Sequence, residues 1–135
     1  MRIALIQMPV IENKKENIET ACRRLREAKA RKADIAVLPE MFCCPYESSC
    51  FRPYGEPEGG EVQRALSALA AELELYIVGG SLPELEDDRV YNTSYVYGRQ
   101  GETLAKHRKA HLFDINVEGG QSFKESDVFS PGNAV

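Results

Sequence analysis

The sequence predicts an α/β fold with a mixed, mostly parallel sheet and helices on one face. Two apolar segments, "RIALIQM" at residues 2–8 and "ADIAVLPE" at 33–40, have the length and composition of buried strands. The segment between them repeats apolar residues at helical steps. A strand, a helix and a second strand in such a short span predict a right-handed parallel βαβ unit. The chain has 135 residues, 43% hydrophobic and 28% charged, which suits one globular domain.

The first predicted helix covers residues 14–32. Its apolar residues recur at steps of three and four, and Asn13 is the expected N-cap, with Glu16 completing a capping-box pattern. Basic residues crowd the second half of the helix, where they complement the helix dipole. We therefore interpret them as a solvated helix end and not as a nucleic-acid patch.

The remaining elements are predicted as one helix and three strands. A Pro- and Gly-rich loop at 41–60 precedes a helix at 61–73, and strands follow at 75–84, 89–98 and 103–112. The tail is polar and glycine-rich, and "FSPGNAV" reads as a turn followed by the start of another strand. This pattern predicts a fold that is incomplete at residue 135.

Composition argues against several classes of function. The net charge of −4 and a pI near 5.3 oppose a general nucleic-acid binder. The longest apolar stretch, residues 3–11, is too short for a membrane span and lacks the features of a signal peptide, so we expect a cytoplasmic protein. The four cysteines form no CxxC pair, which favours reduced free thiols.

Two side chains could carry chemistry. Glu40 directly follows Pro39 at the carboxyl end of a predicted parallel strand, the edge at which open α/β sheets bind ligands. Lys109 lies in "KHRKAHLFD", where His107, Lys109 and His111 share one face if the strand persists. Position alone does not separate these roles from a solvated loop acid and a surface strand of mixed charge.

Two further motifs have simpler interpretations. His107 and His111, with Asp114 nearby, could hold a metal ion, but the HxxxH spacing suits a helix and not a strand. Gly79 and Gly80 follow a strand, but the GxGxxG pattern is absent and no strong helix signal comes after them. A bend explains the two glycines better than a phosphate-binding loop.

A series of motifs spans the whole chain. In order they are "IALIQMPV", "LPEMF", "CCPY", "IVGGSLPE", "YNTSYVYG", "KHRKAHLFDINVEGG" and "FKESDVFSPGN". Each is a modest signal alone, but together and in this order they are highly specific. On these motifs the chain resembles the nitrilase superfamily of carbon–nitrogen hydrolases, and within it the omega-amidase-like branch.

The resemblance implies a mechanism with three groups and no cofactor or metal. A cysteine thiolate attacks an amide or nitrile carbon, a glutamate acts as general base and then general acid, and a lysine stabilises the tetrahedral intermediate. Glu40 in "LPE" matches the glutamate, and Lys109 in "RKAHLFD" matches the lysine. Glu125 in "FKES" matches a second glutamate that orders the lysine or the substrate, while Glu118 remains a competitor for this role.

The resemblance also implies a substrate class. We expect a small carboxamide such as an omega-amide of an α-keto dicarboxylic acid, with N-carbamoyl amide hydrolysis as the alternative. Tyr46 matches a pocket-lining position, and Tyr46, His111 or Arg108 could meet the distal carboxylate of such a substrate. We expect a homo-oligomer with a small-molecule substrate and with neither a nucleic-acid nor a membrane partner.

The nucleophilic cysteine of the family has no match in this chain. In the family it lies on a later strand elbow, in the second half of an α-β-β-α sandwich. The resemblance therefore implies that residues 1–135 are the N-terminal part of a single hydrolase domain, that the nucleophile lies outside them, and that this part alone is inactive. Two alternatives stay open: a truncated, non-catalytic module, and a shortened enzyme that uses Cys43 or Cys44.

Overall fold

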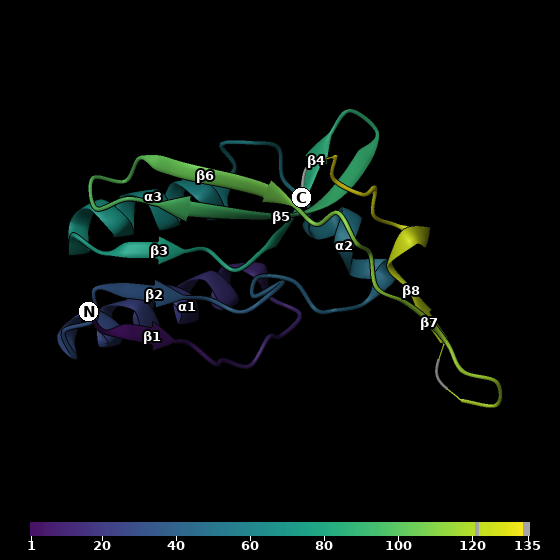
Figure 1. Cartoon of the computed structure of the whole chain (residues 1–135), viewed down its shortest axis with the longest axis horizontal. Helices are drawn as coiled ribbons and strands as arrows, with labels where there is room; N and C mark the ends of the chain where they lie inside the picture. Colours follow the sequence, from purple (N-terminus) through teal and green to yellow (C-terminus); the bar gives the residue numbers. More distant parts are fainter. Residues whose placement is uncertain (121, 134–135) are drawn as a thin grey trace.

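The computed structural model describes residues 1–120 and 122–133, which form a six-stranded mixed sheet with helices on one face (Figure 1). The first three strands are parallel, whereas β5 runs antiparallel to β3, β4 and β6. The predicted α/β class with a mixed sheet is confirmed. The strands of this sheet are β1 (Ile3–Leu5), β2 (Ile35–Val37), β3 (Tyr76–Val78), β4 (Leu82–Glu86), β5 (Arg89–Tyr97) and β6 (Thr103–Arg108).

Two long helices, α1 (Lys14–Ala30) and α3 (Glu61–Leu73), lie behind the strands in the view of Figure 1. Helix α1 starts where the sequence predicts, because the side chain of Asn13 accepts a hydrogen bond from the Glu16 N–H at 3.1 Å. The core lies between these helices and the sheet. Its fully buried side chains include Leu25 of α1, Leu66 of α3 and Ile77 of β3.

The other face of the sheet carries apolar side chains, and the described residues place no helix on it. Side chains alternate along a strand, so Ile3 and Leu5 of β1 point away from the helices, as does Tyr76 of β3. Leu5 leaves 82% of its surface exposed. The register sets Ile35 between Ile3 and Tyr76, which makes the apolar surface continuous across three strands.

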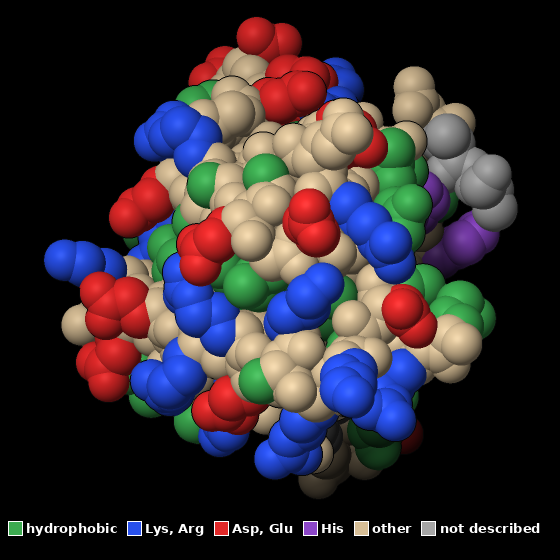
Figure 2. All heavy atoms as spheres, turned by 90° about the vertical axis from the view of Figure 1, so that its left-hand side faces the viewer, with side chains coloured by type: hydrophobic (Ala, Val, Ile, Leu, Met, Phe, Trp, Pro, Cys, Tyr) green, Lys and Arg blue, Asp and Glu red, His purple; other side chains and the backbone are tan. Residues whose placement is uncertain are grey.

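Charged side chains of both signs alternate over the end of the molecule that carries the N-terminus (Figure 2). This mixed pattern differs from the one-sign stripe that nucleic-acid binders present. Within residues 1–120 and 122–133, no helix combines the length and the apolar character needed to cross a bilayer.

The segment between β2 and α3 contains a helix that the sequence did not predict. Helix α2 (Ser48–Tyr54) has only seven residues and includes Pro53, so it shows no helical periodicity and reads as part of a loop. Its Phe51 is fully buried, which indicates that tertiary packing and not local preference stabilises this helix.

The strands of the structure are shorter than the predicted ones, and one predicted strand is divided into two. The segment at 75–84 bends at Gly79 and Gly80 into β3 and β4, because β4 turns to pair with the start of β5. The expected bend at these glycines is therefore confirmed. The segment at 103–112 stops at Arg108, and the tail adds an antiparallel pair, β7 (Asp114–Asn116) and β8 (Ser122–Lys124), before the 3-10 turn η1 (Glu125–Asp127).

Candidate active site

Glu40 is carried to the carboxyl end of the parallel strands by the geometry around Pro39. The Leu38 N–H still donates to the carbonyl of Val78 at 3.0 Å, one residue beyond β2. Pro39 has no N–H to continue this pairing, so the chain leaves the sheet there. Met41, which follows Glu40, adopts the left-handed conformation with φ +50° and donates its N–H to Ser81 Oγ at 3.1 Å. These contacts fix the backbone on both sides of Glu40.

Gly80 allows the segment between β3 and β4 to approach the turn that contains Glu40 closely. Its φ is +57°, and a Cβ at this position would overlap the carbonyl oxygen of Pro39. Only glycine adopts this conformation without strain and leaves room for the neighbouring backbone. The bend therefore brings Ser81, at the start of β4, against the turn that holds Glu40.

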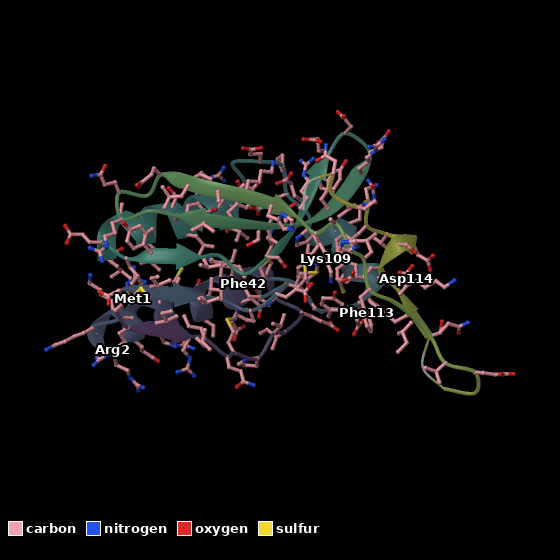
Figure 3. All side chains as sticks on the ribbon, in the orientation of Figure 1. Met1, Arg2, Phe42, Lys109, Phe113 and Asp114 are labelled. Atoms are coloured by element: carbon pink, nitrogen blue, oxygen red, sulfur yellow. The ribbon has the colours of Figure 1, made fainter. Side chains whose placement is uncertain are left out.

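Lys109 follows β6 directly and is held by its backbone on both sides. Its N–H donates to the carbonyl of Asn92 at 2.8 Å, and its carbonyl accepts the N–H of Gly132 at 2.9 Å. Its Nζ lies 3.1 Å from Glu40 Oε1 and 3.0 Å from Glu125 Oε1. Figure 3 places Lys109 near Phe113, at the end of the sheet where β5 and β6 meet the tail.

The ammonium group of Lys109 is stabilised in its charged form. Burial acts to lower the pKa of Lys109, but hydrogen bonds to Glu125 and Glu40 outweigh burial, and the pKa is raised. The lysine is therefore a fixed cation at neutral pH. This is the protonation state that can stabilise a developing oxyanion.

Glu125 is the buried partner of this lysine. Its side chain is fully buried, and its Oε2 accepts the Phe113 N–H at 2.6 Å. Its Oε1 accepts the hydroxyl of Tyr46 as well as the lysine ammonium. Burial, followed by the hydrogen bond to Glu125, raises the pKa of Tyr46, so the phenol stays protonated and donates.

An open cleft of about 270 Å³ lies beside these groups. It gives Glu40 and Lys109 a shared space in which a small molecule could meet both. Asn92 donates from Nδ2 to Glu40 Oε1 at 2.7 Å, a contact that the sequence analysis missed. No single signal marked it, because β5 also carries Thr93 and Ser94 beside Asn92. The lining residues are Glu40, Gly80, Ser81, Asn92, Ser94, His107 and Lys109.

Four of the five site residues predicted from the sequence meet in space, namely Glu40, Lys109, Glu125 and Tyr46. The fifth, His111, is exposed and does not line the cleft, because β6 ends before it and the expected alternation stops. Neither catalytic nor substrate-binding roles follow from position alone. The cluster can nevertheless exchange a proton at a carboxylate and neutralise an anion at an ammonium.

Three other candidates do not join the cluster. Glu118 is exposed in the turn after β7, away from the contacts that Lys109 makes. Arg108 is bound by Glu84 and Glu86, so its guanidinium is not available for a substrate carboxylate. No set of three or more His, Cys, Asp or Glu side chains in the described part of the chain is arranged to hold a metal ion.

None of the four cysteines lines the cleft. Cys43 and Cys44 are buried in the core, and burial raises the pKa of each thiol to about 12. Cys22 lies in α1 and Cys50 in α2. Thiols with so high a pKa carry almost no thiolate at neutral pH, which makes Cys43 and Cys44 poor nucleophiles.

Comparisons with known proteins identify the family and its relatives. A family model described as carbon–nitrogen hydrolase matches residues 2–135. The chain is 45% identical to the omega-amidase NIT2 of Bos taurus over 133 residues, which cover 98% of this chain and 48% of that protein. The chain therefore spans about half the length of the curated relatives it matches.

Solved structures show the same fold. Nit3 of Saccharomyces cerevisiae, a member of branch 10 of the nitrilase superfamily, superposes with a TM-score of 0.83 at 33% identity and covers 98% of this chain and 48% of its own. A carbon–nitrogen hydrolase from Helicobacter pylori G27 gives a TM-score of 0.79 at 25% identity, with 98% and 45% covered. The match to the family model over residues 2–135, together with these relatives, shows that the chain belongs to the carbon–nitrogen hydrolase family of the nitrilase superfamily.

Proposed function

We propose that this chain supplies the general base and the cation of an amidase active site. In this proposal the full-length protein hydrolyses small carboxamides such as omega-amides of α-keto dicarboxylic acids, in keeping with its omega-amidase relatives. The observation that carries it is the convergence of Glu40 and Glu125 on Lys109 Nζ, at 3.1 and 3.0 Å, beside an open cleft. The chemistry needs no cofactor or metal.

The nucleophile in this proposal is a cysteine outside residues 1–135. The support is that none of the four thiols of this chain lines the cleft. Glu40 takes the proton of the incoming thiol, and the thiolate attacks the carbonyl carbon of the amide. The carbonyl oxygen gains the negative charge, and the Lys109 ammonium, which is the one lysine or arginine among the described residues that line the cleft, neutralises it.

The second half of the reaction reuses the same carboxyl group. Glu40 gives its proton to the amide nitrogen, the carbon–nitrogen bond breaks, and ammonia leaves behind a thioester. Glu40 then takes a proton from water as the water attacks the thioester carbon. The carbon–sulfur bond breaks, and Glu40 returns the proton to the departing thiolate, which leaves the carboxylic acid, the free thiol and an ionised Glu40. Glu125 holds the lysine throughout, because its buried carboxylate accepts the ammonium, the Tyr46 hydroxyl and the Phe113 N–H.

The test compares two substrates with the full-length protein. Ammonia release is measured with α-ketoglutaramate and with an N-carbamoyl amino acid. Turnover of the first supports the proposed substrate class, turnover of the second alone supports the N-carbamoyl alternative, and no thiol-dependent turnover of any amide supports a non-catalytic module.

A matched pair of variants tests the role of Glu40. Glu40→Gln keeps the shape but removes the base, and it should lower kcat by roughly 100- to 10,000-fold. Glu58→Gln is the control, since Glu58 is also an exposed carboxylate paired with a lysine, here Lys106 at 2.7 Å. Equal activity in the two variants would contradict the assignment of Glu40.

A further inference from the structure

We propose that Asn92 is a positioning residue that holds one oxygen of Glu40 and leaves the other to move the proton. The inference rests on the proposed amidase function and concerns the same cleft. It assigns a role to a residue of β5 that belongs to the motif "YNTSYVYG" but to which neither the sequence analysis nor the comparisons gave a function.

The hydrogen bonds of Glu40 are distributed unevenly over its two carboxylate oxygens. Oε1 accepts Asn92 Nδ2 at 2.7 Å and Lys109 Nζ at 3.1 Å, while the Tyr46 hydroxyl, which donates to Glu125, lies 3.4 Å away. Within the described residues, Oε2 accepts no hydrogen bond. An oxygen that already accepts two donors is a poor proton acceptor, so Oε2 is the atom that takes the proton of the thiol and later returns it.

Asn92 also holds the lysine through its backbone. Its carbonyl accepts the Lys109 N–H at 2.8 Å, while its side chain donates to Glu40. The residue is nearly fully buried and sits in the ladder opposite Pro83 of β4, so neither its backbone nor its side chain has much freedom. One residue of the sheet therefore sets the distance between the base and the cation, which come from segments 69 residues apart.

The amide group suits this position for a physical reason. It donates a hydrogen bond to a carboxylate without adding charge, so it orients Glu40 and does not compete with Lys109. An aspartate in its place would keep the size of the side chain but face Glu40 with a second negative charge, which favours the protonated form of the carboxyl pair.

The experiment measures kcat, KM and the pH profile of kcat/KM for three variants of the full-length protein. Asn92→Ala should lower kcat by roughly 10- to 100-fold with a smaller change in KM, because Glu40 loses its orientation. Asn92→Asp should move the acidic limb of the profile upward by about one pH unit.

Asn17→Asp is the matched control. Asn17 is as deeply buried as Asn92, and its amide bonds the backbone of Ile11 at 3.0 and 2.8 Å, far along the chain from the site. Its substitution should lower the melting temperature but leave the acidic limb where it is. A loss of activity that came only from weakened folding would leave the limb unmoved in both aspartate variants.

The outcomes separate the two proposals. An active enzyme that depends on Glu40 but keeps its acidic limb in Asn92→Asp would overturn the role of Asn92 alone. An enzyme whose amide hydrolysis is unaffected by Glu40→Gln would overturn the proposed function, and this inference with it. A shifted limb in Asn92→Asp and an unshifted one in Asn17→Asp would support the inference.

Discussion

Replacing Lys109 by alanine tests the central electrostatic claim, because the chain contains a closely matched control. Lys106 lies three residues earlier on the same sheet edge, and both lysine side chains are 28% exposed. Each joins one fully buried glutamate to one exposed glutamate. Lys109 joins Glu125 to Glu40, and Lys106 joins Glu84 to Glu58.

The expected loss of stability is larger for Lys109→Ala, because Glu125 then keeps only neutral donors, whereas Glu84 keeps the Arg108 guanidinium after Lys106→Ala. In each case a buried carboxylate loses one charged donor and keeps two others: Glu125 keeps Tyr46 and the Phe113 N–H, and Glu84 keeps Tyr95 and Arg108. The loss of a charged donor from a buried group costs about 1–3 kcal/mol, so Lys106→Ala should lie at the lower end of this range and Lys109→Ala at the upper end.

The expected loss of activity differs. Lys109→Ala removes the cation that faces the oxyanion, and loss of one such group lowers kcat by roughly 100- to 1,000-fold, which corresponds to about 3–4 kcal/mol. Lys106 does not line the cleft, so Lys106→Ala should retain nearly all activity.

Two measurements on the full-length protein test whether Lys109 is the oxyanion cation. Denaturant unfolding gives the stability of each variant, and ammonia release under saturating substrate gives kcat. Comparable losses of kcat in the two variants, or a fully active Lys109→Ala protein, would refute the assignment of Lys109 as the oxyanion cation.

Further predictions concern pH, thiol reactivity, backbone geometry and assembly. Because the pKa of Lys109 is raised in the folded state, its stabilising contribution is fully present below the ordinary value of 10.5 and is lost as the pH rises through the raised value; the stability difference between wild type and Lys109→Met should stay constant from pH 7 to 9 and shrink above about 10.5. Iodoacetamide should label Cys43 and Cys44 far more slowly in the native protein than in denaturant, and alanine at either position should not abolish ammonia release; loss of turnover from one of these variants would restore that thiol as a nucleophile. Gly80→Ala should destabilise the protein by about 3 kcal/mol or more in denaturant unfolding, whereas Gly59→Ala, with φ +76° but open space around it, should cost only about 1–2 kcal/mol. Residues 1–135 expressed alone should aggregate or self-associate in sedimentation and light scattering, because the apolar sheet face is uncovered, and a monomer with a cooperative melt would count against this.

Local patterns were sufficient to locate most of the elements. The Asn13 cap placed the start of α1, the two apolar runs placed β1 and β2, and Pro39 placed Glu40 at a strand end. Helix α2 escaped the sequence analysis because seven residues with an internal proline carry no periodic signal. The sequence analysis also did not predict that β6 ends at Arg108, since β-propensity alone does not indicate where strand pairing stops.

The sequence by itself determined the family and which residue types could carry the chemistry, because both reside in the order and spacing of short motifs. Only the tertiary structure decided that Glu125, and not Glu118, binds Lys109, and that Asn92 joins Lys109 to Glu40. The physical reason is that alternation along a strand fixes the face on which a side chain lies but not its partner. Partners are fixed by strand register and by the bend at Gly80, which depend on contacts between segments far apart in the chain.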